Sequence, residues 1–300
     1  MAENIKIYFL GTSDSVPSAK RNHPSIWLNY KGENILIDCG EGTQRQIRKA
    51  RLNPCKITRI LITHWHADHV LGIPGLLKTL EMSGYNRKLF IYGPRGTKRK
   101  LKAFMEMFNV RGEYEIEVSE VSSNFFKGID FSLNAESMTH GTPCNAYSFE
   151  LKNKIRIDKK KLKKFKIKEG PHLKKIKEGK GIIYKGKKYS AKKLTYTEEG
   201  KKISFVLDTS FNKRIAPFVK NSNVLVSEST FMPDMKEKAK EYKHLTVDQV
   251  AKIAKKSKVG KLFLVHVSQR FSKNQEEVLK EAKKIFKNSY LPKDLDVVEV

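Results

Sequence analysis

Cysteine is scarce in this sequence: three residues among 300, at Cys39, Cys55 and Cys144. They are odd in number and form no Cys-x-x-Cys pair, a pattern typical of reduced, partly buried thiols in a cytosolic protein. No stretch approaches the roughly 20 apolar residues that span a bilayer. The segment Met1–Ile5 also lacks the basic and apolar regions of a signal sequence. We therefore expect a soluble, cytoplasmic protein with no membrane attachment.

Acidic residues are few relative to basic ones. The sequence has 32 Asp and Glu against 60 Lys and Arg, a net charge of +28 and a pI near 9.8. Adaptation to heat or salt is one explanation of this excess of basic residues, and binding to an anionic polymer is the other. The excess is concentrated between Leu151 and Lys193, where 19 Lys or Arg stand against three acids, a net +16.

The segment 151–193 differs in character from the rest of the chain. Turn signals occur at Gly170-Pro171 and at Gly179-Lys180-Gly181. Apolar residues are interspersed among the lysines, which argues against simple disorder and favours a small extension with its own hydrophobic contacts. Its ammonium groups suit a phosphate backbone. A polybasic membrane patch is the alternative, but no lipidation site or transmembrane anchor accompanies it.

Outside this segment the pattern is mixed α/β. Predicted strands are Ile5–Leu10, Ser25–Tyr30, Asn34–Ile37, Ile60–Ile62, Leu89–Tyr92, Tyr114–Val118, Phe131–Ala135, Tyr147–Leu151, Ile203–Leu207, Val224–Val226 and Leu262–Val265. Predicted helices are Gly42–Lys49, Ile73–Met82, Arg99–Phe108, Val247–Lys256 and Gln275–Phe286. Strands outnumber helices and arrive in runs, which favours two packed sheets flanked by helices over one parallel sheet.

A His-x-His-x-Asp-His motif at residues 64–69 places four potential metal ligands within six residues, directly after an apolar, strand-like run. In an extended chain alternate side chains share a face, so His64 and His66 point the same way. Asp68 and His69 can turn toward a second ion. Two ions about 3.5–4 Å apart clamp the attacking and leaving oxygens of a hydrolysis. These ligand types suit zinc, and iron or manganese are alternatives.

Three more candidate ligands follow strand-like runs, namely His140, Asp208 and His266. Functional side chains collect at the carboxyl ends of strands because the loops there converge while the sheets stay rigid. One carboxylate can offer an oxygen to each ion, so Asp208 is expected to bridge them. Asp38 also ends a strand-like run and is expected to orient a ligand imidazole by accepting its other N–H. His23 and His172 are interpreted as polar surface residues rather than ligands.

At this point the sequence resembles a known family. The chain is similar to tRNase Z (ribonuclease Z) of the metallo-β-lactamase superfamily over nearly its whole length. The most specific marks are Gly40-Glu41-Gly42-Thr43-Gln44, the pairing of Glu228-Ser229-Thr230-Phe231 with His244-Leu245-Thr246, and the inserted basic segment; further marks are Leu10-Gly11-Thr12, Thr139-His140-Gly141, Leu207-Asp208-Thr209 and His266-Val267-Ser268-Gln269-Arg270.

The resemblance implies an α+β fold, the αββα four-layer sandwich, as a single metallo-β-lactamase-fold domain over 1–300. The Lys-rich segment 151–193 matches the family's tRNA-binding arm. The implied activity is zinc-dependent endoribonuclease cleavage that removes 3′ trailers from precursor tRNA, carried out by a homodimer with two Zn²⁺ per subunit.

The resemblance also implies roles for single residues. It places His64, His66 and His140 on one zinc, with Asp68, His69 and His266 on the other and Asp208 between them. Asp68 would also accept a proton from the attacking water. His244 would protonate the leaving 3′ oxygen, oriented by Glu228.

Other functions compete with this interpretation. A small-molecule phosphodiesterase or thioester hydrolase of the same fold would share every metal ligand, but the concentrated charge of 151–193 disfavours it. A nuclease of the β-CASP branch would need a long domain inserted between ligands, and the interval 208–266 is too short for one. A non-catalytic RNA-binding protein would have no use for a complete ligand set.

Overall fold

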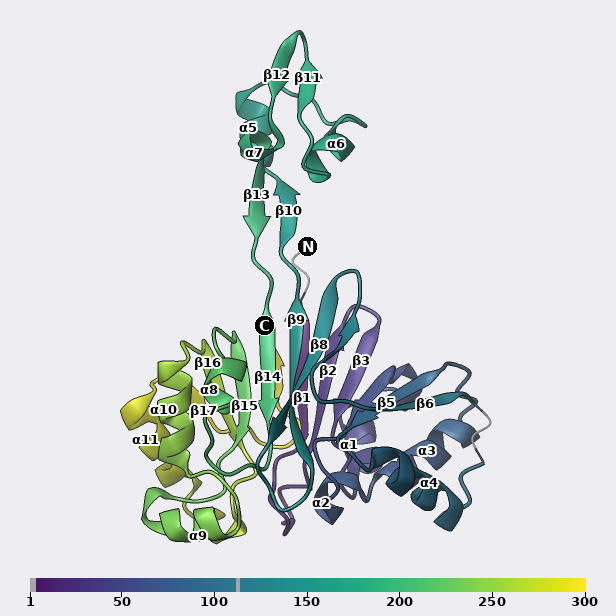
Figure 1. The fold of residues 1–300 in the computed structure, drawn as a ribbon, viewed down its shortest axis with the longest axis vertical. Helices are drawn as coiled ribbons and strands as arrows, with labels where there is room; N and C mark the ends of the chain where they lie inside the picture. Colours follow the sequence, from purple (N-terminus) through teal and green to yellow (C-terminus); the bar gives the residue numbers. More distant parts are fainter. Residues whose placement is uncertain (1–3, 112–113) are drawn as a thin grey trace. The chain divides into compact units, whose positions relative to one another are not determined.

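The computed structural model describes residues 4–111 and 114–300, so the start of the segment Met1–Ile5 lies outside the described residues. The chain divides into two compact units. The larger consists of Met1–Lys127, Ser132–Phe149 and Lys202–Val300, and the smaller of Gly128–Phe131 and Glu150–Lys201. Figure 1 labels their elements, with β10 to β13 and α5 to α7 in the smaller unit.

The first sheet of the larger unit has seven strands, in the order β18-β1-β2-β3-β4-β5-β6. Their bounds are β1 (Ile5–Gly11), β2 (Ser25–Tyr30), β3 (Glu33–Ile37), β4 (Arg59–Leu61), β5 (Leu89–Gly93), β6 (Ile116–Glu120) and β18 (Val297–Glu299). The strands from β18 to β3 pair antiparallel, and those from β3 to β6 pair parallel. The carboxyl ends of β3 and β4 therefore meet at one edge.

The second sheet also has seven strands, in the order β17-β16-β15-β14-β9-β8-β7. Their bounds are β7 (Asn124–Lys127), β8 (Phe131–Met138), β9 (Cys144–Leu151), β14 (Lys202–Val206), β15 (Val224–Glu228), β16 (Lys261–Val265) and β17 (Ser289–Tyr290). The strands β14, β15, β16 and β17 run parallel, which again gathers three carboxyl ends, those of β14 to β16, at one edge.

Helices cover the outer face of each sheet. Their bounds are α1 (Thr43–Lys49), α2 (Ala67–Val70), α3 (Ile73–Met82), α4 (Thr97–Met107), α8 (Ile215–Phe218), α9 (Lys236–Glu241), α10 (Val247–Lys256) and α11 (Gln275–Ile285), with a 3₁₀ turn η2 at Pro233–Met235. A capping box of Thr246 and Gln249 begins α10. Among the described residues, no helix has both the length and the apolarity that crossing a bilayer requires.

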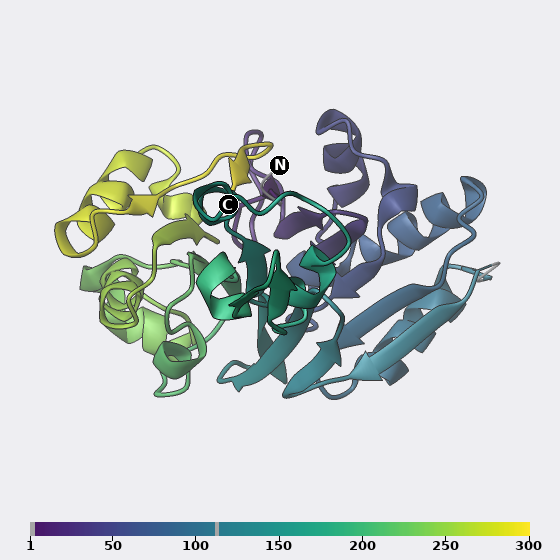
Figure 2. The same cartoon turned by 90° about the horizontal axis from the view of Figure 1, so that it is seen from above.

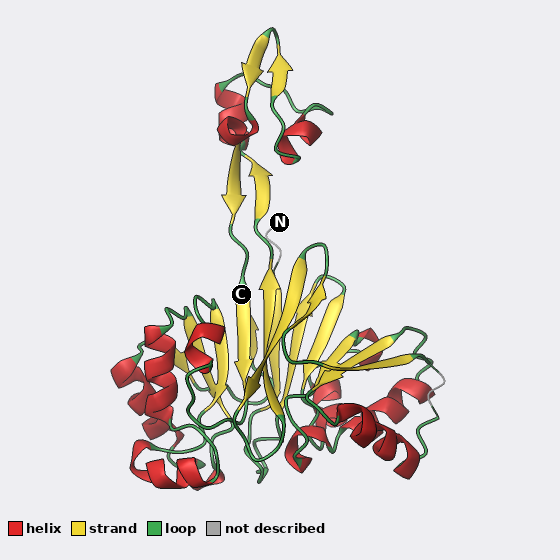
Figure 3. Ribbon diagram, viewed as in Figure 1, coloured by secondary structure: helices red, strands yellow, loops and turns green. Residues whose placement is uncertain are grey.

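Alternation along the central strands explains the layers. Ile60 and Ile62 pack in one buried cluster with Leu76 of α3. On the other sheet, Leu262 and Leu264 pack in a second cluster that includes residues of α10 and α11. Because successive side chains of a strand point to opposite faces, the residues between them face the other sheet. The predicted αββα sandwich is confirmed (Figures 2 and 3).

Aromatic side chains fill the space between the two sheets. The rings of Phe9 (β1) and Phe263 (β16) lie 5.4 Å apart, and those of Tyr30 (β2) and Phe149 (β9) lie 5.6 Å apart. Phe9 is fully buried. These contacts join the sheets directly, so the parallel strand ends of both sheets are held in fixed relation.

The element predictions were most accurate where periodicity is long. Ile73–Met82 and Val247–Lys256 are helices with the predicted bounds. The prediction missed the strands β7, β17 and β18, which have four residues or fewer and are too short to display an alternating pattern. The strand β4 is as short, but the apolar run Ile60–Ile62 marked it.

The smaller unit has its own core. The strand β10 (Lys154–Ile157) pairs antiparallel with β13 (Thr195–Glu198), and β11 (Ile182–Tyr184) pairs with β12 (Lys187–Tyr189). The helices are α5 (Lys159–Lys164), α6 (Leu173–Lys177) and α7 (Ala191–Leu194). One buried cluster joins them, formed by Leu162, Ile167, Ile176, Ile182, Ala191 and Leu194. The lysines between these positions face solvent.

We expect Phe9→Ala to lower the free energy of unfolding by about 3–5 kcal/mol, because it leaves a cavity between the sheets. Urea unfolding measures this loss. The matched control is Met82→Ala at the exposed end of α3, which should change stability by less than about 0.5 kcal/mol. Equal effects of the two substitutions would contradict the assignment of the inter-sheet core.

Candidate metal centre

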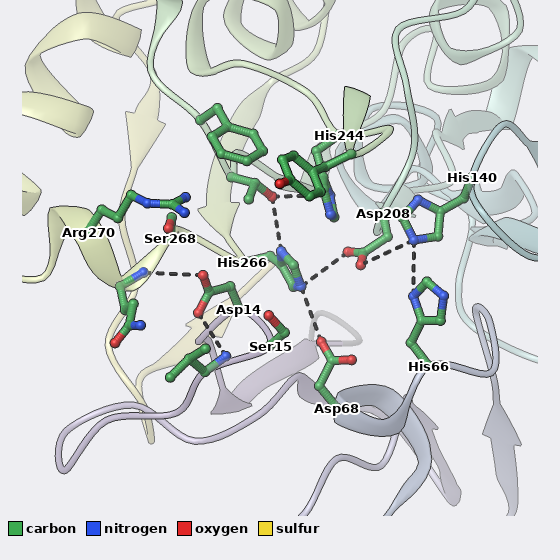
Figure 4. A pocket seen from close by; sticks show the side chains of 15 residues that line it. Asp14, Ser15, His66, Asp68, His140, Asp208, His244, His266, Ser268 and Arg270 are labelled. Atoms are coloured by element: carbon green, nitrogen blue, oxygen red, sulfur yellow. Dashed lines mark hydrogen bonds and ion pairs between the residues drawn. The ribbon is translucent and has the colours of Figure 1, made fainter. Parts of the chain in front are cut away.

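The predicted ligands come from loops that follow strand ends. The motif at 64–69 follows β4, His140 follows β8, Asp208 follows β14 and His266 follows β16. Asp208 and His266 have φ angles of 53° and 54°. Residues other than glycine rarely adopt this left-handed region, and such backbone often clusters at functional sites. Figure 4 shows His66, Asp68, His140, Asp208 and His266 converging on one pocket.

One group of converging side chains consists of His64, His66, His140 and Asp208. Nδ1 of His66 lies 3.0 Å from Nε2 of His64 and 3.2 Å from Nε2 of His140. The Asp208 carboxylate completes the group, with Oδ2 3.5 Å from Nε2 of His64. All donor atoms of this group lie within 4.8 Å of one another.

A second group consists of Asp68, His69, Asp208 and His266, all buried. Nε2 of His69 lies 3.3 Å from Oδ2 of Asp68 and 3.4 Å from Oδ2 of Asp208. Nε2 of His266 lies 3.4 Å from the other oxygen of Asp208. Asp208 therefore belongs to both groups, in the position from which it was predicted to bridge two ions.

The distal nitrogens of these imidazoles have partners that define their tautomers. Asp38 accepts a hydrogen bond from Nδ1 of His69 at 2.6 Å, so the predicted contact of Asp38 is present. Nδ1 of His140 donates to the carbonyl oxygen of Lys243 at 3.0 Å. With Nδ1 engaged in this way, Nε2 of His69 and of His140 is the nitrogen left to face its group, as a metal ligand requires.

Two threonine hydroxyls likewise accept hydrogen bonds from Nδ1 of a site imidazole. Thr63 donates its hydroxyl to Asp38 and lies 3.1 Å from Nδ1 of His64, from which it accepts. Thr230 donates to Glu228 and lies 3.0 Å from Nδ1 of His266. The sequence reasoning missed Thr230 and the Lys243 carbonyl, because neither a hydroxyl nor a backbone oxygen forms part of a ligand motif.

The electrostatics differ between the two groups: burial favours neutral imidazoles in the first, whereas carboxylates outweigh burial and raise the pKa of His69 and His266 in the second. Burial, reinforced by neighbouring imidazoles, lowers the pKa of His64 well below its usual value. Burial also lowers the pKa of His66 and His140. Within the described part of the chain, Nε2 of His69 and Oδ1 of Asp208 are buried with no hydrogen-bond partner. Unpaired buried donor atoms and facing lone pairs are costly unless a cation lies between them.

His244 and Glu228 form a pair beside the second group. Glu228 is fully buried, and its Oε2 accepts from Nδ1 of His244 at 3.0 Å. Burial lowers the pKa of His244, but the Glu228 carboxylate outweighs burial and raises it to about 9. His244 is therefore protonated at neutral pH, which suits a proton donor better than a metal ligand.

All these groups open into a pocket of about 380 Å³. His66, Asp68, His140, Asp208, His244 and His266 line it, together with residues to which no role was assigned from sequence, among them Asp14, Tyr242 and Arg270. Arg270 lies in the short 3₁₀ helix Gln269–Phe271, which follows His266. Its guanidinium gives the pocket a positive charge suited to a phosphate.

Neither remaining histidine belongs to a group of potential ligands among the described residues. His172 lies in the smaller unit, partly buried, with its ring 5.3 Å from that of Tyr184. The interpretation of His23 as a surface residue was wrong, because only 8% of it is exposed. The close approach of Gly40, where an added Cβ would lie 2.5 Å from the His23 Cβ, explains this burial.

The chain has relatives among known proteins. A family model described as Anti-Pycsar protein Apyc1 matches residues 5–286. A Ribonuclease Z of Nanoarchaeum equitans is 35% identical over 98% of this chain and 92% of its own length. A Ribonuclease Z of Methanococcus maripaludis is 39% identical over 89% of each chain.

Solved structures also resemble the chain. The short form of human tRNase Z superposes with a TM-score of 0.71 at 25% identity, covering 98% of both chains. The metallo-beta-lactamase fold protein YhfI from Bacillus subtilis has a TM-score of 0.73 at 17% identity, with 99% of this chain and all of YhfI covered. The second likeness bears on the fold alone.

We expect Asp38→Asn to weaken binding of a divalent metal ion about 10–100-fold, because an amide cannot accept every hydrogen bond that Asp38 receives from His69 and Thr63. Asn tolerates the left-handed backbone at this position, where φ is 56°. Competition with a chelator of known affinity measures the change. The control is Asp248→Asn, on α10. Unchanged affinity in Asp38→Asn would contradict the orienting role.

Proposed function

The chain belongs to the ribonuclease Z family, and we propose that it is a zinc-dependent endoribonuclease that removes 3′ trailers from precursor tRNA in the cytoplasm. The observation that carries the proposal is the pair of His and Asp groups that share Asp208 beside the Glu228–His244 pair. Nitrogen and carboxylate donors without cysteine suit zinc.

Two zinc ions per chain are proposed. His64, His66 and His140 would hold one, Asp68, His69 and His266 would hold the other, and Asp208 would bridge them. Bound at these positions, the ions would supply an acidified water and positive charge for the phosphoryl oxygens.

The chain's own residues would then move the protons. Asp68 would accept the proton of the attacking water, since its carboxylate lines the pocket. Burial raises the pKa of Asp68, but the neighbouring His266 and His69 outweigh burial and hold it far below its usual range, so the carboxylate is ionised. His244 would donate the proton that the leaving 3′ oxygen requires, and Glu228 would keep it charged and oriented.

The smaller unit would bind the tRNA body. Its lysines point to solvent from a folded core, an arrangement that suits phosphate contacts without sequence readout. We further propose a homodimer in which the arm 151–193 of one subunit holds substrate cleaved by the other.

A small-molecule phosphodiesterase or thioester hydrolase is the main competing function, since it would use the same donors. Incubation with a 3′-extended tRNA transcript, with and without chelator, followed by end mapping, decides between them. One chelator-sensitive cut at the 3′ side of the tRNA body is expected. Turnover of small esters without tRNA cleavage would contradict the proposal.

If His244 is the proton donor, its removal should lower kcat by an amount that depends on the leaving group of the substrate. His244→Ala should lower kcat on precursor tRNA about 10²–10⁴-fold, because the 3′ oxygen leaves poorly without a proton. The same variant should retain most of its turnover of bis(p-nitrophenyl) phosphate, since p-nitrophenolate leaves unprotonated. Zinc content is the control for an intact site. Equal losses on both substrates would indicate a structural role instead.

The arm role predicts a separable binding defect. Replacing the exposed Lys163, Lys164, Lys174 and Lys175 by Gln should weaken precursor tRNA binding at least about tenfold and flatten its salt dependence. Turnover of bis(p-nitrophenyl) phosphate should stay unchanged. A matched variant replaces Lys273, Lys280, Lys283 and Lys287, exposed lysines of the larger unit. Equal binding defects in the two variants would refute the arm role.

A further inference from the structure

A second large cavity, of about 900 Å³, lies in the larger unit between α8, η2 and α10. Five lysines line it, namely Lys213, Lys220, Lys236, Lys252 and Lys256. We call this cavity the lysine groove. Nothing in the proposed chemistry uses these residues.

The charge of the lysine groove is largely uncompensated. All five lysines are exposed, and Asp248 is the one acidic residue in the lining. Asp248 pairs with Lys252 at 2.7 Å. Within the described chain, the other four lysines have no carboxylate partner. Four free ammonium groups around one cavity attract a polyanion.

The wall between these lysines is apolar. Phe211 has 59% of its surface exposed, and Ala216, Pro217, Pro233 and Ile253 line the same cavity. An aromatic ring with most of its surface exposed can stack on a nucleobase. Lysines that follow a backbone, together with an aromatic platform, are the combination by which proteins bind single-stranded nucleic acid.

Two short segments connect the lysine groove to the metal centre. The first runs from Asp208, which lines the metal-centre pocket, to Phe211 and Lys213 in the groove. The second runs from Thr230 and Phe231 in the pocket to Pro233 and Lys236 in the groove. The backbone of the first segment is anchored beside His140, since Ser210 donates to the carbonyl oxygen of Thr139 at 2.8 Å.

We propose that the lysine groove binds the single-stranded 3′ trailer of the substrate, with a base stacked on Phe211 and phosphates on the lysines. This inference rests on the proposed function and adds a binding site for the part of the RNA beyond the cut. A duplex is the poorer fit, because its bases are hidden in the stack and leave nothing to contact an apolar wall.

The test compares kcat/KM on precursor tRNAs whose trailers have about two and about ten nucleotides. For the unmodified protein, the long trailer should be preferred. Phe211→Ala should reduce that preference at least about fivefold, the loss expected for one stacked base, while kcat/KM on the short trailer stays unchanged. The matched control is Phe108→Ala, at an exposed aromatic residue that follows α4.

A charge variant tests the phosphate contacts independently. Replacing Lys213, Lys220 and Lys256 by Ala should make the slope of log kcat/KM against log salt concentration, measured on the long trailer, shallower by about two. The control replaces Lys280, Lys283 and Lys287, which lie on or just after α11. This control should leave the trailer-length preference as it is in the unmodified protein.

Two results would overturn the inference while leaving the proposed function intact. One is efficient cleavage of precursor tRNA with no preference for trailer length. The other is an equal loss of kcat/KM by the Phe211 and lysine variants on both substrates, which would mean that the groove contacts the tRNA body. Failure of the unmodified protein to cleave any precursor would instead remove the proposed function and this inference with it.

Discussion

The structure depends on a set of imidazole lone pairs and carboxylate oxygens that face one another around Asp208. Each buried Nε2 is committed to this arrangement, because hydrogen bonds from Nδ1 to Asp38, Thr63, Thr230 or the Lys243 carbonyl determine the tautomer. Without a positive charge between them, Nε2 of His69 and Oδ1 of Asp208 lie buried with no hydrogen-bond partner among the described residues. The ligand geometry, the buried supporting groups and the left-handed backbone at Asp38, Asp208 and His266 are all explained by a centre built for cations.

The fold provides the rigidity that this arrangement needs. Two sheets packed through aromatic contacts hold the carboxyl ends of β3, β4, β14, β15 and β16 near one pocket. Residues far apart in the chain thereby meet within hydrogen-bond distance: His66 and His140, 74 positions apart, on one side, and Asp68 and His266, 198 positions apart, on the other. Their positions follow from strand register rather than from local flexibility.

Much of this could be predicted from sequence, for physical reasons. The motif at 64–69 is local, and Asp208, His140 and His266 each follow an apolar run that reads as a strand. Thr230 and the carbonyl oxygen of Lys243 could not be found, because their roles arise only when distant loops pack together. The burial of His23 was missed for the same reason, since it depends on the close approach of Gly40. The lysine groove combines residues from α8, η2 and α10, and no spacing in the sequence indicates that they share one cavity.

Zinc stoichiometry of the purified, folded chain tests the central claim most directly, by equilibrium dialysis followed by elemental analysis of the unmodified protein and of Asp208→Ala. Two ions per chain are expected for the unmodified protein. Loss of at least one ion is expected for the variant, because Asp208 belongs to both groups of donors. A folded, unmodified chain that binds fewer than two equivalents of zinc, or an Asp208→Ala variant that binds as much as the unmodified chain, would contradict a metal centre organised around Asp208.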